Sequence, residues 1–292
     1  VNLKMDAEIL EKYLRAGKIA SSAIEYGKSI IKVGERAEKI ADEIDSFIIS
    51  KGGKPAFPVN LSRNDEAAHY SPGFNDDRRI SNNDIIKLDL GVHIDGYIAD
   101  TAISIDMSGK NEKLLNASRY ALENVARNLR PGITLNDIGE IIENSINFFN
   151  YKPIYNLTGH QLDRYILHTG MSFPNYPSGE KDIVKNGMAF AIEPFATDGM
   201  GLIKEGKFGN ILMLMDEKEF PEVYEKYLSL PFSVRWVYRD FSQPEKIMEK
   251  LMNSRKVKKF GILVEKKHGN VSQHEHTFVI FNDRIYITTL LK

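Results

Sequence analysis

A repeated segment constrains the fold of this chain more than any other feature of its sequence. Gly34 and Lys54-Pro55 recur as Gly132 and Lys152-Pro153, and both pairs are offset by 98 residues. Each copy precedes an apolar strand candidate that carries an acidic residue, Asp89 in the first half and Glu193 in the second. We therefore expect an α+β fold built from two copies of a helix–helix–strand unit, and a chance match of short segments is the alternative.

Apolar residues with helical spacing precede the strand candidates in both halves. The pattern predicts helices over residues 5–31, from Gly34 to Gly52, over 111–129, and from the capping residue Thr134 to Ile146. Thr134 is a good N-cap because its hydroxyl can accept a hydrogen bond from a free backbone N–H of the first turn.

Residues 84–106 read as a β-hairpin. Apolar side chains alternate with polar ones from Ile86 to Ile94, and Asp95-Gly96 supplies the turn. A turn centred between Ile94 and Asp95 places Asp89 directly opposite Asp100, whereas a turn centred on Asp95-Gly96 shifts the pairing by one step. In either register two carboxylates come close, and they repel each other unless a cation lies between them.

Three more polar residues extend this pair of aspartates to a set of five. Each alone is more typical of a solvated strand end or a capping residue, but apolar neighbours favour burial, and buried carboxylates need partners. Four carboxylates and one imidazole suit two divalent metals with shared carboxylates, which predicts metal-assisted hydrolysis. The set is Asp89, Asp100, His160, Glu193 and Glu275.

Four other histidines flank these segments. His69 lies in AAHYSP and His168 in ILHTG, and each alone is a weak candidate for catalysis. His274 and His276 adjoin Glu275, and by the two-residue period of a strand they face away from it, so we interpret them as non-ligands.

The long stretch between Glu193 and Glu275 predicts an insertion. Residues 1–200 and 261–292 would form the catalytic domain, and 201–260 an inserted helical subdomain with helices near 220–228 and 244–252. A basic cluster at 255–259 is more typical of a solvated face than of a nucleic-acid patch.

Composition narrows the class of protein. The chain of 292 residues has no cysteine, which excludes disulfides, thiolate zinc sites and a cysteine nucleophile. Its net charge of -1 gives no general attraction to nucleic acid or anionic membranes. The first residues are charged and lack the apolar core of a secretory signal, and no apolar run is long enough for a membrane span, so we expect a cytoplasmic protein.

Several segments together resemble the methionine aminopeptidases of the pita-bread fold, a fold that also contains prolidases and creatinase. The segments are KLDLGVHIDGYIADTA, NLTGHQLDRYILHTG, FAIEPF, QHEHTF and, upstream, AFPVNLSRNDEAAHYSP. The resemblance covers nearly the whole chain. The insertion after FAIEPF is similar to that of the type 2 enzymes, where it forms a helical, winged-helix-like subdomain, and the short N-terminal region is similar to archaeal members.

The resemblance also implies roles for individual residues. Asp89 would chelate one divalent ion, His160 and Glu193 the other, and Asp100 and Glu275 would bridge the two. Glu193 would also move a proton, while His69 and His168 would contact the scissile amide or the tetrahedral intermediate. Phe57 would line the pocket for the methionine side chain.

The implied activity is removal of the initiator methionine from nascent polypeptides by water that the metal pair activates. The two divalent metal ions would be Co, Mn, Fe or Zn. The substrates would be N-terminal Met peptides and nascent proteins, and contact with the ribosome stays open. The enzyme would be a cytoplasmic monomer without membrane contact. The alternatives are an Xaa-Pro peptidase of the same fold and a non-catalytic binding relative.

Overall fold

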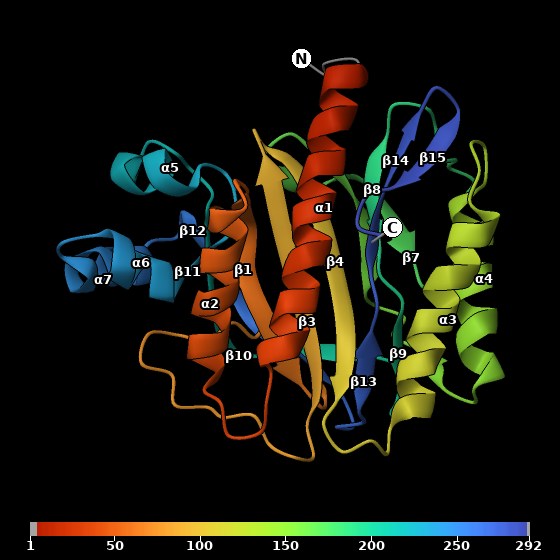
Figure 1. Cartoon of the computed structure of the whole chain (residues 1–292), viewed down its shortest axis with the longest axis horizontal. Helices are drawn as coiled ribbons and strands as arrows, with labels where there is room; N and C mark the ends of the chain where they lie inside the picture. The colour runs from red at the N-terminus through yellow and green to blue at the C-terminus, as the bar shows by residue number, and fades with distance from the viewer. Residues whose placement is uncertain (1–4, 291–292) are drawn as a thin grey trace.

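The first half of the chain packs two helices against an antiparallel sheet. The structure, a computed structural model, describes residues 5–290. Figure 1 shows α1 lying across the central strands, with α2 beside it. The sheet has the order β1-β3-β4. The elements of this half are α1 (Ala7–Ile30), α2 (Ala37–Ser50), β1 (Lys54–Arg63), β2 (Glu66–Ala68), β3 (Ile85–Ile94) and β4 (Tyr97–Asp106).

The second half again begins with two helices, which lie on the opposite side of the molecule from the inserted region (Figure 1). They cover a five-stranded sheet of order β15-β14-β8-β6-β7 and a three-stranded sheet of order β13-β9-β5. The elements are α3 (Glu112–Asn128), α4 (Leu135–Phe148), β5 (Lys152–Pro153), β6 (Thr158–Asp163), β7 (Ile166–Pro174), β8 (Ala189–Ile192), β9 (Phe195–Thr197), β13 (Val271–Gln273), β14 (His276–Phe281) and β15 (Arg284–Ile287).

The expected α+β class and the four helices are confirmed. Helices α2 and α4 begin and end at the same offset that relates Gly34 to Gly132, so the repeated sequence folds into equivalent helices. Thr134 caps α4, because its hydroxyl accepts a hydrogen bond from the Asp137 N–H at 3.0 Å. The Asp137 carboxylate in turn accepts a weaker hydrogen bond from the Thr134 N–H, and the two bonds form a capping box.

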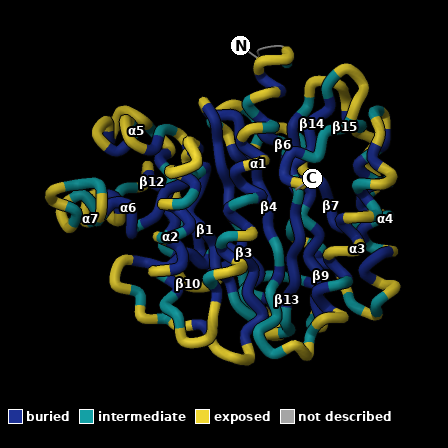
Figure 2. Tube along the Cα trace, viewed as in Figure 1, coloured by how far each residue is buried: buried dark blue, intermediate teal, exposed yellow. Residues whose placement is uncertain are grey.

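The region between β9 and β13 contains the two helices expected there, and also a third helix and strands that the sequence did not predict. Its helices pack around an apolar cluster of their own, which includes Phe220, Tyr227, Trp236 and Leu251. Figure 2 shows that exposed residues gather on α5 and α7. The elements are β10 (Ile203–Leu214), α5 (Pro221–Tyr227), β11 (Phe232–Ser233), α6 (Val234–Asp240), α7 (Pro244–Asn253) and β12 (Val257–Glu265).

Strands β10 and β12 join this region to the first half. They form a long antiparallel pair, and β12 also pairs with β2 in a sheet of order β11-β10-β12-β2. None of the helices within residues 5–290 combines the length and the apolar character that crossing a bilayer requires.

Candidate metal centre and its pocket

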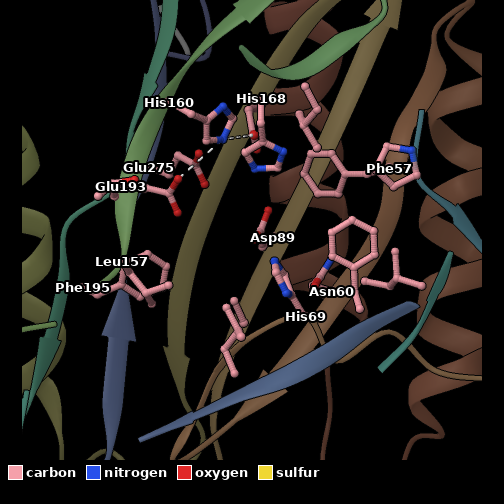
Figure 3. Close-up of a pocket in the computed structure, with 18 of the residues that line it drawn as sticks. Phe57, Asn60, His69, Asp89, Leu157, His160, His168, Glu193, Phe195 and Glu275 are labelled. Carbon is pink, nitrogen blue, oxygen red and sulfur yellow. Dashed lines mark ion pairs between the residues drawn. The ribbon is translucent and has the colours of Figure 1, made fainter. Parts of the chain in front are cut away.

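The five expected ligands line one cavity of about 240 Å³. Each comes from a different segment, and Figure 3 shows the side chains of Asp89, His160, Glu193 and Glu275 pointing into the same space. The segments are β3 for Asp89, β4 for Asp100, β6 for His160, the end of β8 for Glu193 and the start of β14 for Glu275.

The hairpin places its two aspartates on one face but not directly opposite each other. Ile94 pairs with Tyr97, so the turn is centred on Asp95-Gly96 and the shifted register is the observed one. Asp100 lies opposite Gly91, two residues along the strand from Asp89. Residues two apart in a strand share a face, so both carboxylates point into the cavity as diagonal neighbours.

Hydrogen bonds between the halves fix Glu275 beside Asp100. The Glu275 N–H donates to the Ala102 carbonyl at 2.9 Å. The hydroxyl of buried Thr277 accepts from the Asp100 N–H at 2.7 Å and donates to the Asp100 carbonyl at 2.8 Å. On the other side of the cavity, His160 pairs with Ala191 of β8, which brings it close to Glu193.

Asp100, His160 and Glu275 each offer a ligand atom, and these three atoms lie within 4.8 Å of one another. His160 Nε2 lies 3.4 Å from Asp100 Oδ2 and 3.5 Å from Glu193 Oε1. The five residues thus present carboxylate oxygens and an imidazole nitrogen to a common space, which is the donor set that divalent metals of intermediate hardness prefer.

The electrostatics of the cavity call for a cation. Burial raises the pKa of Asp89, Glu193 and Glu275 well above the usual range, and the neighbouring carboxylates raise it further. Burial also raises the pKa of Asp100 to about 8. One oxygen each of Asp89, Asp100 and Glu275 is buried without a hydrogen-bond partner in the described part of the chain. Divalent ions would satisfy these oxygens and offset the repulsion between the carboxylates, so the residues fit such a group.

His160 also suits a metal ligand. Its side chain is buried, and burial lowers its pKa to about 4, which keeps the imidazole neutral near pH 7. A neutral ring nitrogen can donate its lone pair to a metal ion, whereas a protonated one cannot.

Sequence reasoning missed Gln273, which holds two of the carboxylates in place. Its Nε2 donates to Glu275 Oε2 at 3.2 Å and makes a longer contact of 3.4 Å with Asp89 Oδ2. Gln273 lies two residues before Glu275, on the same strand face, and this period was the available signal. An amide that donates to ligating carboxylates orients them, as such neighbours commonly do in metal sites.

His69 and His168 reach the cavity from opposite walls, as Figure 3 shows. His69 has a φ of 66°, a conformation that is unfavourable for a residue with a side chain. A Cβ at position 209 would lie 1.9 Å from the His69 carbonyl, so Gly209 leaves the room for this backbone. Burial and the neighbouring His168 lower the pKa of His69 to about 4, and desolvation and His160 lower the pKa of His168.

An apolar wall completes the cavity. Phe57 lies in it as expected, and a Cβ on Gly91 would meet the Phe57 ring at 2.3 Å, so the glycine provides the space for that ring. Sequence reasoning missed the rest of the wall, much of which comes from the inserted region. These residues are Leu157, Leu167, Phe195, Ile211, Pro231, Phe260 and Leu263.

The histidines beside Glu275 face away from the cavity. His274 Nδ1 lies 2.8 Å from the Ser118 hydroxyl, and His276 Nδ1 lies 2.8 Å from the Thr289 hydroxyl. Both hydrogen bonds lie within the packing of the second half, away from the carboxylates.

Comparisons with known proteins match this geometry. Residues 11–238 match the model of metallopeptidase family M24. A methionine aminopeptidase of Methanocaldococcus jannaschii is 40% identical over 98% of this chain and 100% of the relative. One of Saccharolobus solfataricus is 39% identical over 98% of this chain and 99% of the relative.

Solved structures share the fold at lower sequence identity. A methionine aminopeptidase from Rickettsia prowazekii aligns with a TM-score of 0.73 and 22% identity over 99% of this chain and 100% of that one. A thermophilic Arx1 aligns with a TM-score of 0.84 and 16% identity over 97% and 91% of the two chains. A prolidase from Pyrococcus furiosus has a TM-score of 0.63 and 17% identity over 100% and 66%. These likenesses establish the pita-bread fold.

Proposed function

The chain belongs to metallopeptidase family M24, within which it is a metal-dependent methionine aminopeptidase, and we propose that it removes the initiator methionine from nascent polypeptides. The observation that carries the proposal is the convergence of four carboxylates and a neutral imidazole beside an apolar wall in one cavity. The polar side suits a scissile peptide bond, and the apolar side suits the methionine side chain.

We propose two divalent ions in this cavity, with Asp89, Asp100, His160, Glu193 and Glu275 as their ligands. Asp100 and Glu275, whose ligand atoms lie within 4.8 Å of each other, would be shared by the two ions, while Asp89 would hold one ion and His160 and Glu193 the other. When bound, such ions polarise a carbonyl and lower the pKa of water. Co, Mn, Fe and Zn all accept this donor set.

The protein's own groups would position the substrate and move the proton. His69 and His168 are neutral near pH 7, so each can donate one ring N–H to the scissile carbonyl or to the oxyanion that develops there. A Glu193 carboxylate oxygen would take the proton of the attacking water and deliver it to the leaving amine.

Phe57, Leu157 and Phe195 would enclose the methionine side chain. These residues line the apolar part of the cavity, and Gly91 leaves the space that the Phe57 ring occupies. A thioether chain packs well against aromatic rings because sulfur is polarizable, which favours methionine over a polar first residue.

Several finer assignments belong to the same proposal. Residues 201–260 would form the inserted subdomain of the type 2 enzymes, supported by their separate apolar cluster, and 1–200 with 261–292 the catalytic domain. The enzyme would act as a cytoplasmic monomer on nascent chains, close to the ribosome.

A peptide assay tests the proposal. Release of methionine from Met-Ala-Ser should stop after chelation and return when Mn, Co, Fe or Zn is added back, while Ala-Pro peptides should stay intact. Preferential cleavage of Xaa-Pro peptides would replace the proposal with the prolidase activity. No cleavage by protein that retains two bound metals would favour a binding relative.

A further inference from the structure

One face of the β10–β12 pair continues from the cavity outward. Ile211 pairs with Phe260, and both residues line the cavity of the candidate metal centre. Two residues further along each strand, Met213 pairs with Lys258. Because side chains two apart share a strand face, Met213 and Lys258 extend the surface that begins with Ile211 and Phe260.

This surface forms the wall of a second, more open groove of about 610 Å³. The groove shares His69, His168 and Phe260 with the cavity, so the two spaces meet at the histidines that would flank the scissile amide. If the methionine side chain fills the cavity, the rest of the bound polypeptide must extend out of the cavity past these histidines. The groove is therefore the path for the residues that follow the scissile bond.

Lys258 is a cation in this path that no carboxylate neutralises. Its side chain is exposed, and its Nζ lies 4.5 Å from the centre of the Phe260 ring, the ring that packs edge-on against His69. Within residues 5–290 no carboxylate comes within 4.0 Å of this ammonium. Glu205, the acidic residue of the groove, instead accepts a hydrogen bond from the Gly261 N–H at 3.1 Å.

The neighbouring lysines differ from Lys258. Lys259 also lines the groove, but it is only partly exposed and its Nζ donates to the Ser254 carbonyl at 2.8 Å. Lys256 Nζ lies 3.3 Å from Asp216 Oδ2, and Lys256 does not line the groove. Lys258 alone among the three combines exposure, a place on the groove wall and a free charge.

We propose that Lys258 determines substrate specificity by favouring polypeptides with an acidic side chain at their third or fourth residue, an inference that rests on the proposed aminopeptidase function. The position follows from the spacing. Two residues of strand separate Lys258 from Phe260, which corresponds to about 7 Å. An extended substrate advances by a similar amount over two residues, so its third and fourth side chains lie within reach of the ammonium.

The test compares peptide amides of the form Met-Ala-Gly-Gly-Gly that carry one aspartate or one asparagine at position three or four. Asparagine matches aspartate in size, and the amide removes the terminal carboxylate. The aspartate peptide should have a kcat/KM about two- to five-fold higher at low salt, the range of an exposed ion pair. The ratio should fall toward one at high salt, because screening weakens the attraction.

Three variants assign the effect to one side chain. Lys258→Gln should bring the aspartate-to-asparagine ratio to about one, and Lys258→Arg should retain the preference. Lys256→Gln, a matched control two residues before Lys258 and outside the groove lining, should leave the ratio as in the wild type.

The outcomes separate the two proposals. A wild-type ratio of one, or an unchanged ratio in Lys258→Gln, would overturn the inference while methionine release from every peptide upholds the aminopeptidase function. Failure to release methionine from any peptide in the presence of metal would instead refute the proposed function and the inference with it.

Discussion

Replacing Asp45 with asparagine should loosen the inserted region from the first half of the molecule. Asp45 lies on α2 and is fully buried, and one of its oxygens accepts hydrogen bonds from Arg235 Nη2 at 2.6 Å and from Trp236 Nε1 at 2.7 Å. Both donors belong to α6 of the insertion. Burial raises the pKa of Asp45 and the Arg235 guanidinium opposes that shift, so the carboxylate depends on its partner.

The expected loss is about 3 kcal/mol in the free energy of unfolding, the lower end of the 3–5 kcal/mol typical of a broken buried ion pair. The lower end applies because Arg235 Nε also lies 2.7 Å from Asp42 Oδ1, and Asp42 is half exposed. In the variant, Asp42 therefore still offsets part of the charge of the buried Arg235 guanidinium. A loss of this size corresponds to a decrease of roughly 6–12 °C in Tm.

The same substitution should lower kcat. Arg235 Nη1 donates to the Ser71 hydroxyl at 3.2 Å and to the Pro72 carbonyl at 3.1 Å. These residues follow His69, whose unfavourable backbone conformation needs support from its surroundings. Releasing Arg235 from Asp45 therefore weakens the support for a histidine in the cavity.

Thermal unfolding gives the stability change, and hydrogen exchange of residues 234–240 shows whether the insertion opens locally. Asp42→Asn is the matched control and should cost less than about 1 kcal/mol, since exposed ion pairs contribute little. Replacing both Asp45 and Arg235 with apolar residues should recover part of the loss, because no buried charge is then left unpaired. Stability and exchange in Asp45→Asn within error of the wild type would refute the reasoning.

Three further predictions follow from individual residues. Asp100→Asn should reduce turnover by more than about 100-fold and lower bound metal measured by elemental analysis, since it removes a central ligand; near-normal turnover at saturating metal would contradict its assignment. His69→Ala should lower kcat by about 10²–10³-fold with metal content unchanged, and an unaltered kcat would leave His69 a structural role only. Lys87 is fully buried, its Nζ donates to the Asn64 carbonyl at 2.8 Å, and burial lowers its pKa to about 7. Between this pH and the ordinary lysine pKa near 10.4 the unfolded chain binds more protons, so the free energy of unfolding should rise with pH by on the order of 3 kcal/mol. Urea unfolding at pH 7 and 9.5 should show this rise in the wild type and not in Lys87→Met.

The elements that the sequence predicted well depend on local patterns. The hairpin of β3 and β4 follows from alternating side chains around Asp95-Gly96, and the turn alone selects between the two registers. Helices α2 and α4 follow from apolar periodicity, and Thr134 marks the start of the second. Such features are determined by residues that are close in the chain, so they can be predicted from the sequence.

The elements that the sequence did not predict depend on distant partners. Strand β10 begins with Lys204, Glu205 and Lys207, which are exposed and show no apolar alternation, and it is held by pairing with β12. Phe260 and Leu263 enter the pocket wall only because that pairing folds β12 back over the first half. The two-residue spacing between Gln273 and Glu275 indicates that they share a strand face. The contact of Gln273 with Asp89, however, forms only when the two halves pack together.

The two halves have equivalent helices, but the strands that follow these helices differ between the halves. The candidate site lies where the strands differ. Strand β1 is continuous, with an irregular register between Phe57 and Asn60, and both of these residues line the cavity. At the equivalent place in the second half the strand breaks into β5 and β6, which join different sheets, and Leu157 and Thr158 at the break also line the cavity. A regular strand would alternate its side chains between two faces and could not aim neighbouring residues into one space. The irregularity is thus what turns two copies of a packing unit into a binding site, which is why the repeat predicts the scaffold while the lining of the cavity requires the structure.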